Sequence, residues 1–396
     1  MEPNALSSPL EGIQVVDLTQ LLPGVLTTQI LGDLGAEIIK VEPPGTGDKT
    51  RWIPPLIGSQ GAIFCLLNRN KRSLTLDLKS AGGKQVFEQL VRRADLLVEG
   101  FRPGVLGRLG LGLDRLREEN RRLITCSITG YGGTGPWKDR AGHDLNYQAL
   151  AGLVSQGAGE AGGPGVPGSQ VADIGGGTWP AVAGILAALL QRERSGRGQA
   201  VDVSMADGAA LFSVIGYAMA VAGAPGDGPG RGPLTGALPT YGLYRCADDR
   251  YISIAFLGMI EKKFWIDFSR AVGRPEWTER DMAGETMRRD LATLFAERTL
   301  AEWMEILGHD DMCVAPVLEP DEVPRHPHMK ERGLFFDCER PSEGSVPAIA
   351  TPFKLSAQSE LVHRPPPMLG ADTDAILEEL GHDRAGIETL KKLGVV

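Results

Sequence analysis

The sequence contains few cysteines, and none of them belongs to a metal-binding or redox motif. Five cysteines occur in 396 residues, and no C-x-x-C motif is present. We therefore predict neither a zinc ribbon nor a disulfide framework, and the odd, scattered number is typical of a reducing compartment. The five are Cys65, Cys126, Cys246, Cys313 and Cys338.

The sequence also lacks segments that would direct the chain to a membrane. The first residues, MEPNALSSPLEG, contain no basic region followed by an apolar one, so we expect no secretory signal and a cytoplasmic protein. The longest apolar segment, 179–190, is followed by Arg192 and Arg194 and is too short to span a bilayer. We expect a buried helix there and no membrane partner.

Positive charge is not in excess, because the formal net charge is −9. A nucleic-acid partner would require a basic face, so we expect none. A local group of cations could still bind a phosphorylated ligand. The sequence contains no phosphate loop that ends in G-K-[ST] and no nucleophile elbow.

Short apolar segments alternate with segments of helical period from residue 13 onwards. Such alternation implies crossover connections and a mainly parallel sheet that is covered on both faces. We predict an α/β fold with a large doubly wound, Rossmann-like domain. The expected strands are 13–18, 36–41, 74–78, 95–99, 123–128 and 199–204, and the expected helices are 25–34, 80–93, 108–122, 145–156, 178–192 and 206–222.

The Gly/Pro-rich segment 222–236 indicates a boundary to a smaller α+β domain. A hairpin is predicted over 241–246 and 250–256. Helices are expected at 262–272, 288–307 and 372–380, with a short helix after Asp383 and a strand at 312–318.

Three glycines after the strand at 123–128 form a literal G-x-G-x-x-G: Gly130, Gly132 and Gly135. A dinucleotide site needs a helix that begins directly at these glycines. Pro136 and Trp137 follow instead, which is typical of a turn. We therefore expect a tight turn here and no nicotinamide or flavin site.

His143 and Asp173 have the side chains best suited to acid–base chemistry. Imidazole titrates near neutral pH, and a carboxyl group in an apolar setting has a raised pKa. Asp173 precedes three glycines and a predicted helix, where backbone N–H groups could face an oxyanion. From the residues alone, Asp144 and Asp173 can equally be helix caps, and Glu261 can be an ordinary surface charge.

Seven spaced segments resemble the family III (CaiB/BaiF) CoA-transferase superfamily. They are GIQVVDLTQLLPG, LGDLGAEIIKVEPPG, NRNKRSLTLDLKS, LLVEGFRPGVLGRLGLG, ITGYGGTGPW, AGHDLNYQALAG and GQAVDVSMADG. Within the family the chain is most similar to the alpha-methylacyl-CoA racemases, because residues 142–147 match their G-H-D-I-N-Y block. Transferases of the family usually lack this histidine.

The resemblance implies catalytic roles for four residues. His143 and Asp173 would be the two bases, Glu261 would support the histidine, and Asp144 would have a supporting role. Related transferases use the aspartate at position 173 as a nucleophile.

The resemblance also implies a substrate-binding surface. The CoA contacts would be Lys79, Gly100, Phe101, Arg102, Pro103, Gly104, Val105, Arg108, Gly142, His143, Asp144, Leu145, Asn146 and Tyr147. Three positions depart from the family, with Gln20 and Pro43 in places where arginine is common and Val25 in a place where proline is usual. CoA would enter as part of the acyl-CoA substrate, with no metal and no further cofactor.

The family further implies an intertwined homodimer whose active site lies between domains of different subunits. The large domain would contain residues 1–222 and the returning segment 331–396, and the small domain residues 223–330. We predict a racemase or epimerase of 2-methylacyl-CoA thioesters, which uses two-base proton transfer through an enolate. The alternative is a CoA-transferase that forms an aspartyl anhydride.

Overall fold

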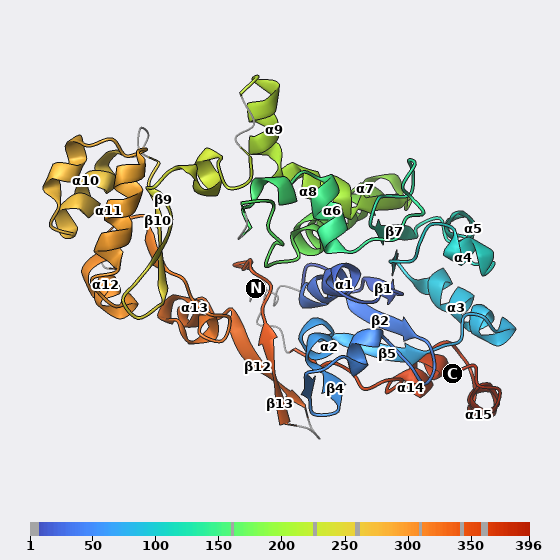
Figure 1. The fold of residues 1–396 in the computed structure, drawn as a ribbon. Coiled ribbons are helices and arrows are strands. Elements are labelled where there is room, and N and C mark those ends of the chain that lie inside the picture. The colour runs from blue at the N-terminus through green and yellow to red at the C-terminus, as the bar shows by residue number, and fades with distance from the viewer. Residues whose placement is uncertain are drawn as a thin grey trace, which may run out of the picture. The chain divides into compact units, whose positions relative to one another are not determined.

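The computed structural model describes residues 8–159, 162–224, 228–257, 262–308, 311–340, 344–357 and 363–396 (Figure 1). The chain forms two compact units. One consists of Met1–Ala151, Ser169–Phe212 and His328–Val396, and the other of Gly152–Gly168 and Ser213–Pro327. The second segment of this second unit begins at Ser213, whereas the sequence places the start of the small domain at residue 223.

The described part of the first unit contains a six-stranded parallel sheet, which confirms the predicted fold class. Numbered along the chain, its order is the 3-2-1-4-5-6 order of doubly wound folds, which bind ligands beyond the carboxyl ends of the strands where the order reverses. That point lies between β1 and β6. In spatial order the strands are β5 (Lys71–Thr75), β2 (Glu37–Glu42), β1 (Gln14–Asp17), β6 (Leu96–Glu99), β7 (Ile124–Thr129) and β8 (Ala200–Ser204).

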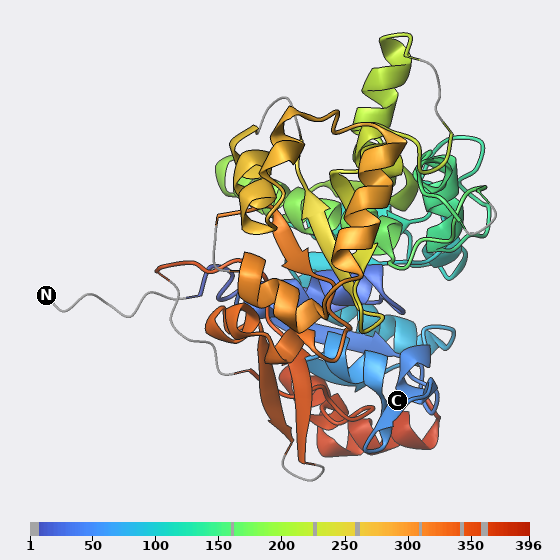
Figure 2. The ribbon, with the colours of Figure 1, turned by 60° about the vertical axis from the view of Figure 1, so that its left-hand side comes forward.

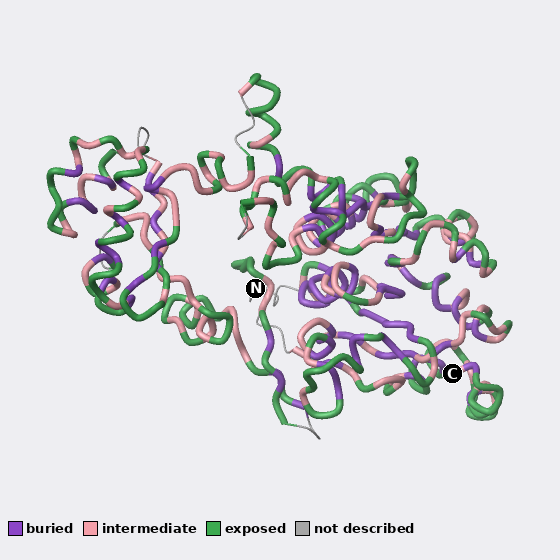
Figure 3. Tube along the Cα trace, viewed as in Figure 1, coloured by how far each residue is buried: buried purple, intermediate pink, exposed green. Residues whose placement is uncertain are grey.

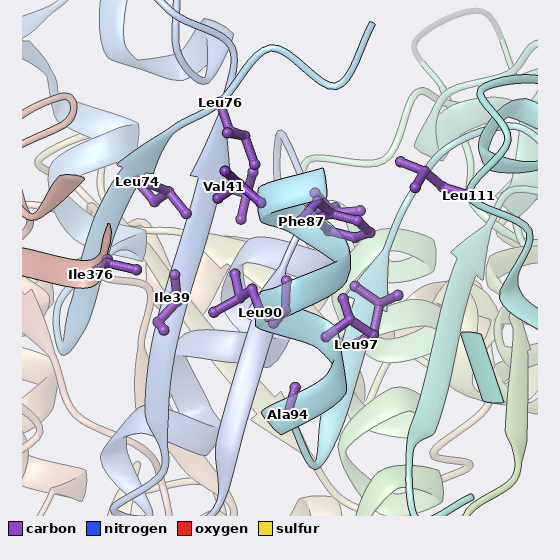
Figure 4. Close-up of a cluster of buried hydrophobic side chains, with 14 of the residues drawn as sticks. Ile39, Val41, Leu74, Leu76, Phe87, Leu90, Ala94, Leu97, Leu111 and Ile376 are labelled. Carbon is purple, nitrogen blue, oxygen red and sulfur yellow. The ribbon is translucent and has the colours of Figure 1, made fainter. Parts of the chain in front are cut away.

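Helices cover both faces of this sheet. Val15 and Val16 are consecutive in β1 and both fully buried, as expected for a parallel sheet covered on both sides. On one face, Phe87 and Leu90 pack against the strands together with Ile376 from near the C-terminus (Figure 4). The helices of this unit are α1 (Pro23–Asp33), α2 (Ala62–Leu67), α3 (Ala81–Arg93), α4 (Val105–Arg108), α5 (Leu113–Glu119), α6 (Asp144–Leu150), α7 (Trp179–Ser195), α8 (Met205–Phe212), α14 (Thr373–Glu379) and α15 (Arg384–Lys392).

The last segment of the chain returns to the first unit. Both ribbon views show the C-terminal helices, in red, beside blue N-terminal elements (Figures 1 and 2). Helix α14 contacts β5, and the Asp372 carboxylate accepts a hydrogen bond of 2.8 Å from the Ser73 backbone N–H. The unit also contains the hairpin β12 (Phe335–Arg340) and β13 (Gly344–Ile349) and the short strands β3 (Leu56–Ile57) and β4 (Gln60–Gly61). The 3-10 helix η1 (Lys49–Trp52) and helix α13 (Pro327–Glu331) complete the list.

Several boundaries differ from those predicted. The strand predicted at 74–78 begins at Lys71, because this buried lysine forms an ion pair of 3.1 Å with Asp17 and so lies inside the sheet. The helix predicted at 108–122 is two helices, separated where Gly110 has φ +81°. The helices predicted at 206–222 and 288–307 are also two each, and the β12–β13 hairpin was not predicted.

The second unit has its own hydrophobic core. An antiparallel sheet of order β11–β10–β9 contains the predicted hairpin, and buried residues along its strands and helices are purple in Figure 3. Aromatic side chains fill this core, among them Trp265, Phe268 and Phe295. Its elements are η2 (Val154–Gln156), α9 (Val214–Val221), η4 (Pro233–Ala237), β9 (Tyr241–Arg245), β10 (Tyr251–Ala255), α10 (Lys262–Ala271), η5 (Pro275–Glu279), α11 (Glu285–Phe295), α12 (Leu300–Leu307), β11 (Val314–Pro316) and η6 (Val323–Arg325).

The apolar helix α7 is longer than the sequence predicts. A π-helical segment, η3 (Ala172–Thr178), continues directly into it, so that one helix runs over Ala172–Ser195. By length and composition this helix could cross a membrane, a criterion that core helices of soluble proteins also meet. Ala181, Val182 and Ile185 are buried, and α7 contacts α1, β7 and β8.

Candidate active site

A cleft of about 680 Å³ lies beyond the carboxyl ends of β1, β6, β7 and β8 in the first unit. This is the edge at which doubly wound sheets bind ligands. Both His143 and Asp173 line it, together with Thr19, Gln20, Leu21, Pro23, Gly24, Lys49, Gly100, Phe101, Arg102, Pro103, Val105, Ile128, Thr129, Gly130, Lys138, Arg140, Ala141, Gly142, Asn146, Tyr147 and Met205. The structure therefore brings the two predicted bases into one cavity within a single chain.

The loop after β7 positions His143 at the start of α6. The Tyr147 hydroxyl donates a hydrogen bond of 2.5 Å to the Gly142 carbonyl, and the Asn146 side chain accepts one of 3.0 Å from the His143 backbone N–H. A Cβ atom on Gly130 would lie 2.4 Å from the Tyr147 ring. The absence of a side chain at this position therefore leaves space for the tyrosine ring. The glycines at 130–135 thus belong to a turn that carries the His143 loop.

Asp144 does not cap its own helix, as the sequence allowed, because α6 begins at Asp144 and His143 is the preceding residue. Its carboxylate instead accepts hydrogen bonds from the backbone N–H groups of Ala172 (2.9 Å) and Asp173 (3.0 Å). These are first-turn donors of η3, which a helix leaves without internal acceptors. Asp144 therefore caps the helix that carries Asp173 and ties it to the His143 loop.

Asp173 has an environment that favours its protonated form. Burial raises the pKa of Asp173 to about 6, and the negative charge of Asp144 acts in the same direction. The charge of His143 acts in the opposite direction, so the two side chains are close enough to interact. An acid with this pKa can both donate and accept a proton near neutral pH.

The glycines after Asp173 allow two helices to pack without side chains between them. A Cβ atom on Gly176 would lie 2.5 Å from the Met205 carbonyl oxygen of α8, and one on Gly208 would lie 2.1 Å from the Gly176 carbonyl oxygen. Asp144 accepts hydrogen bonds from the N–H groups of Ala172 and Asp173, so these two groups are not free to bind an oxyanion. The observed role of the glycines is close packing.

The buried side chain of Lys40 holds two of the segments that line the cleft. The Lys40 ammonium lies 3.0 Å from the Asp48 carboxylate and donates a hydrogen bond of 2.8 Å to the Thr19 carbonyl. Burial opposes the charged form of Lys40, but the Asp17 and Asp48 carboxylates raise its pKa above the ordinary value. Thr19 itself and Lys49, the residue after Asp48, line the cleft.

The structure assembles most, but not all, of the predicted CoA surface. Lys79 and Arg108 are exposed and do not line the cleft, and neither do Asp144 and Leu145. Gly104 lines a neighbouring cavity instead. Glu261 lies outside the described residues. The predicted CoA contacts that do line the cleft are Gly100, Phe101, Arg102, Pro103, Val105, Gly142, His143, Asn146 and Tyr147.

Three cations in the cleft were not singled out from the sequence: Lys49, Lys138 and Arg140. All three are exposed, Lys49 at the start of η1 and the other two in the loop after β7, and such residues usually face solvent. Their position in loops that follow β2 and β7 was the one available signal, because these strands end at the ligand-binding edge of the sheet.

Replacing Asp144 by alanine is expected to lower kcat at least tenfold with a smaller change in KM, because the first turn that carries Asp173 loses its acceptor. Asp144→Asn keeps one oxygen acceptor but removes the charge that raises the Asp173 pKa. We expect this variant to retain more activity and to shift the acidic limb of the kcat/KM profile to lower pH. A pH–rate profile without that shift would contradict the electrostatic role of Asp144.

Comparisons with known sequences and structures identify the family. A sequence profile described as CoA-transferase family III matches residues 10–373. The chain belongs to this family. It is 36% identical to "Alpha-methylacyl-CoA racemase" from Homo sapiens, with 96% of each chain covered. It is 32% identical to "Succinyl-CoA:glutarate CoA-transferase" from Mus musculus, over 98% of this chain and 90% of the relative.

Solved structures of family III proteins have the same fold. A CAIB/BAIF family protein from Brucella suis superposes with a TM-score of 0.82 at 31% identity, over 95% of this chain and 100% of that one. The family III relatives are enzymes that include a racemase and CoA-transferases. The chemistry of the cleft must therefore decide between the two reactions.

Proposed function

We propose that this family III protein racemises or epimerises 2-methylacyl-CoA thioesters. One observation carries the proposal: an imidazole and a carboxyl group, on His143 and Asp173, line one cleft. Inversion at C2 requires removal of a proton from one face and delivery of a proton to the other. The similarity to an alpha-methylacyl-CoA racemase at 36% identity supports this assignment.

In one direction, neutral His143 removes the C2 proton, and the C–H electron pair moves onto the thioester oxygen as an enolate. Protonated Asp173 then delivers its proton to C2 from the opposite face while the carbonyl re-forms. In the other direction, ionised Asp173 is the base and protonated His143 is the acid. In both directions His143 and Asp173 together carry one proton. A pKa of about 6 for Asp173 keeps its protonated and ionised forms both accessible near neutral pH.

The enolate oxygen needs hydrogen-bond donors, whose loss typically slows such reactions 10²- to 10³-fold. We infer that backbone N–H groups supply them. We assign Glu261 the role of orienting His143, as in the family racemases that the chain resembles.

CoA transfer is the second candidate, because several relatives are CoA-transferases. In that reaction ionised Asp173 attacks the thioester carbonyl, the CoA thiolate leaves, and a mixed anhydride of Asp173 with the donor acyl group forms. The CoA thiolate is then transferred to the acceptor acid as a new thioester, and the donor acid is released as Asp173 is regenerated. This chemistry does not use His143. The presence of His143 in the cleft is therefore what supports the racemase proposal over CoA transfer.

Incubation of one enantiomer of a 2-methylacyl-CoA in D2O tests the proposal. We expect deuterium at C2 together with loss of optical purity, measured by mass spectrometry and chiral chromatography. An incubation without protein controls for spontaneous exchange. Passage of CoA to an added carboxylic acid, with no label at C2, would instead establish the transferase.

A further inference from the structure

The cleft carries an excess of positive charge that the proposed proton transfer does not use. Lys49, Arg102, Lys138 and Arg140 line it, whereas Asp173 is the only carboxylate among the described lining residues. None of the four cations forms an ion pair or a side-chain hydrogen bond with a residue that the structure describes. Unpaired cations around one cleft, in a chain of net charge −9, indicate an anionic ligand.

Arg140 is held in place by a series of aromatic rings. Its guanidinium carbon lies 4.1 Å from the centre of the Trp137 ring. Trp137 packs edge-on against Tyr131 at 5.2 Å, and Tyr131 packs edge-on against Tyr147 at 5.1 Å. A guanidinium that stacks on a ring in this way loses less freedom on binding, and its planar donors match a phosphate.

The same series of rings ends at the catalytic loop. Tyr147 is buried, and its hydroxyl bonds to the Gly142 carbonyl next to His143. Lys138 and Arg140 lie in the loop between β7 and this point. A ligand bound by these two cations would therefore fix the loop that carries the imidazole.

We propose that Lys138 and Arg140 bind a phosphate group of the CoA carrier and thereby position the His143 loop. This inference rests on the proposed use of a CoA thioester. Arg140 offers paired N–H donors and Lys138 a point charge to the phosphate oxygens. The phosphate can belong to the diphosphate bridge or to the 3′-phosphate, and both present the same chemistry.

Calorimetric titration with CoA, 3′-dephospho-CoA and pantetheine tests this site without any turnover. We expect Arg140→Ala and Lys138→Ala each to weaken CoA binding about 10- to 100-fold and to leave pantetheine binding unchanged. A loss that persists with 3′-dephospho-CoA assigns the diphosphate, and a loss confined to CoA assigns the 3′-phosphate. Arg140→Lys keeps the charge and should recover part of the affinity.

The matched control is Arg384→Ala, which removes an exposed arginine from α15 that does not line the cleft. Unchanged CoA affinity in Arg140→Ala and Lys138→Ala would overturn the proposal. So would an equal loss of pantetheine affinity, because that result would indicate a general distortion of the loop. Racemisation is measured separately in D2O, so a protein that binds CoA through Arg140 but does not exchange C2 would refute only the racemase function.

Discussion

Replacing His143 by alanine is expected to lower the rate of racemisation by roughly a thousandfold, the typical contribution of a positioned acid–base group. One face of C2 would then lack its proton donor and acceptor, although Asp173 remains. The measurement is the loss of optical purity of a single 2-methylacyl-CoA enantiomer under saturating substrate. The melting temperature should stay near that of the unmodified protein, because His143 is exposed.

The same variant separates the two candidate reactions. CoA transfer to an added acid does not require the imidazole, so a transferase would retain its activity in His143→Ala. The control is His326→Ala, which replaces a histidine that does not line the cleft. Full racemisation by His143→Ala would remove this residue from the mechanism.

Asp173→Asn is expected to abolish both racemisation and CoA transfer, because the amide can act neither as an acid–base group nor as a nucleophile. We expect a loss of at least a thousandfold in kcat. Asp207→Asn, an equal change at an exposed position of α8, should retain full activity. Substantial turnover by Asp173→Asn would contradict both reaction schemes.

The same change should stabilise the fold at alkaline pH. Burial raises the Asp173 pKa from 3.8 to about 6, so the folded state binds more protons than the unfolded state between these values. Stability therefore falls as pH rises through this window and stays lower above it. Because the side chain is partly exposed, we expect Asp173→Asn to gain about 1–2 kcal/mol at pH 8 and nothing at pH 4, measured by thermal unfolding.

The sequence predicts the sheet well where the strands have consecutive apolar residues at their centre. Residues 13–18 and 95–99 are such segments, and both lie in the centre of the sheet as β1 and β6. Strand β5 is different, because Lys71 and Arg72 at its start look like a solvent-exposed turn. The ion pairs of Lys71 with Asp17 and of Arg72 with Glu37 and Glu379 explain their place in the sheet. All three partners are more than thirty residues away in the sequence.

The site was predictable to a similar extent. Acid–base side chains and the family resemblance pointed to His143 and Asp173, and both line the cleft. The way in which Asp144 joins them could not be read from the sequence, because an aspartate before an apolar helix looks like a cap of that helix. A role for Lys138 and Arg140 could not be predicted either, because they reach the cleft only through the fold of the turn after β7.

The contact between Gly176 and Gly208 has a consequence for mutational screens. Helix α8 touches the backbone of η3 directly, so any side chain introduced at either glycine must push the two helices apart and displace Asp173. A random screen for inactive variants would therefore recover changes in α8 that never meet a substrate. Such positions support the helix that carries Asp173 and do not take part in the reaction.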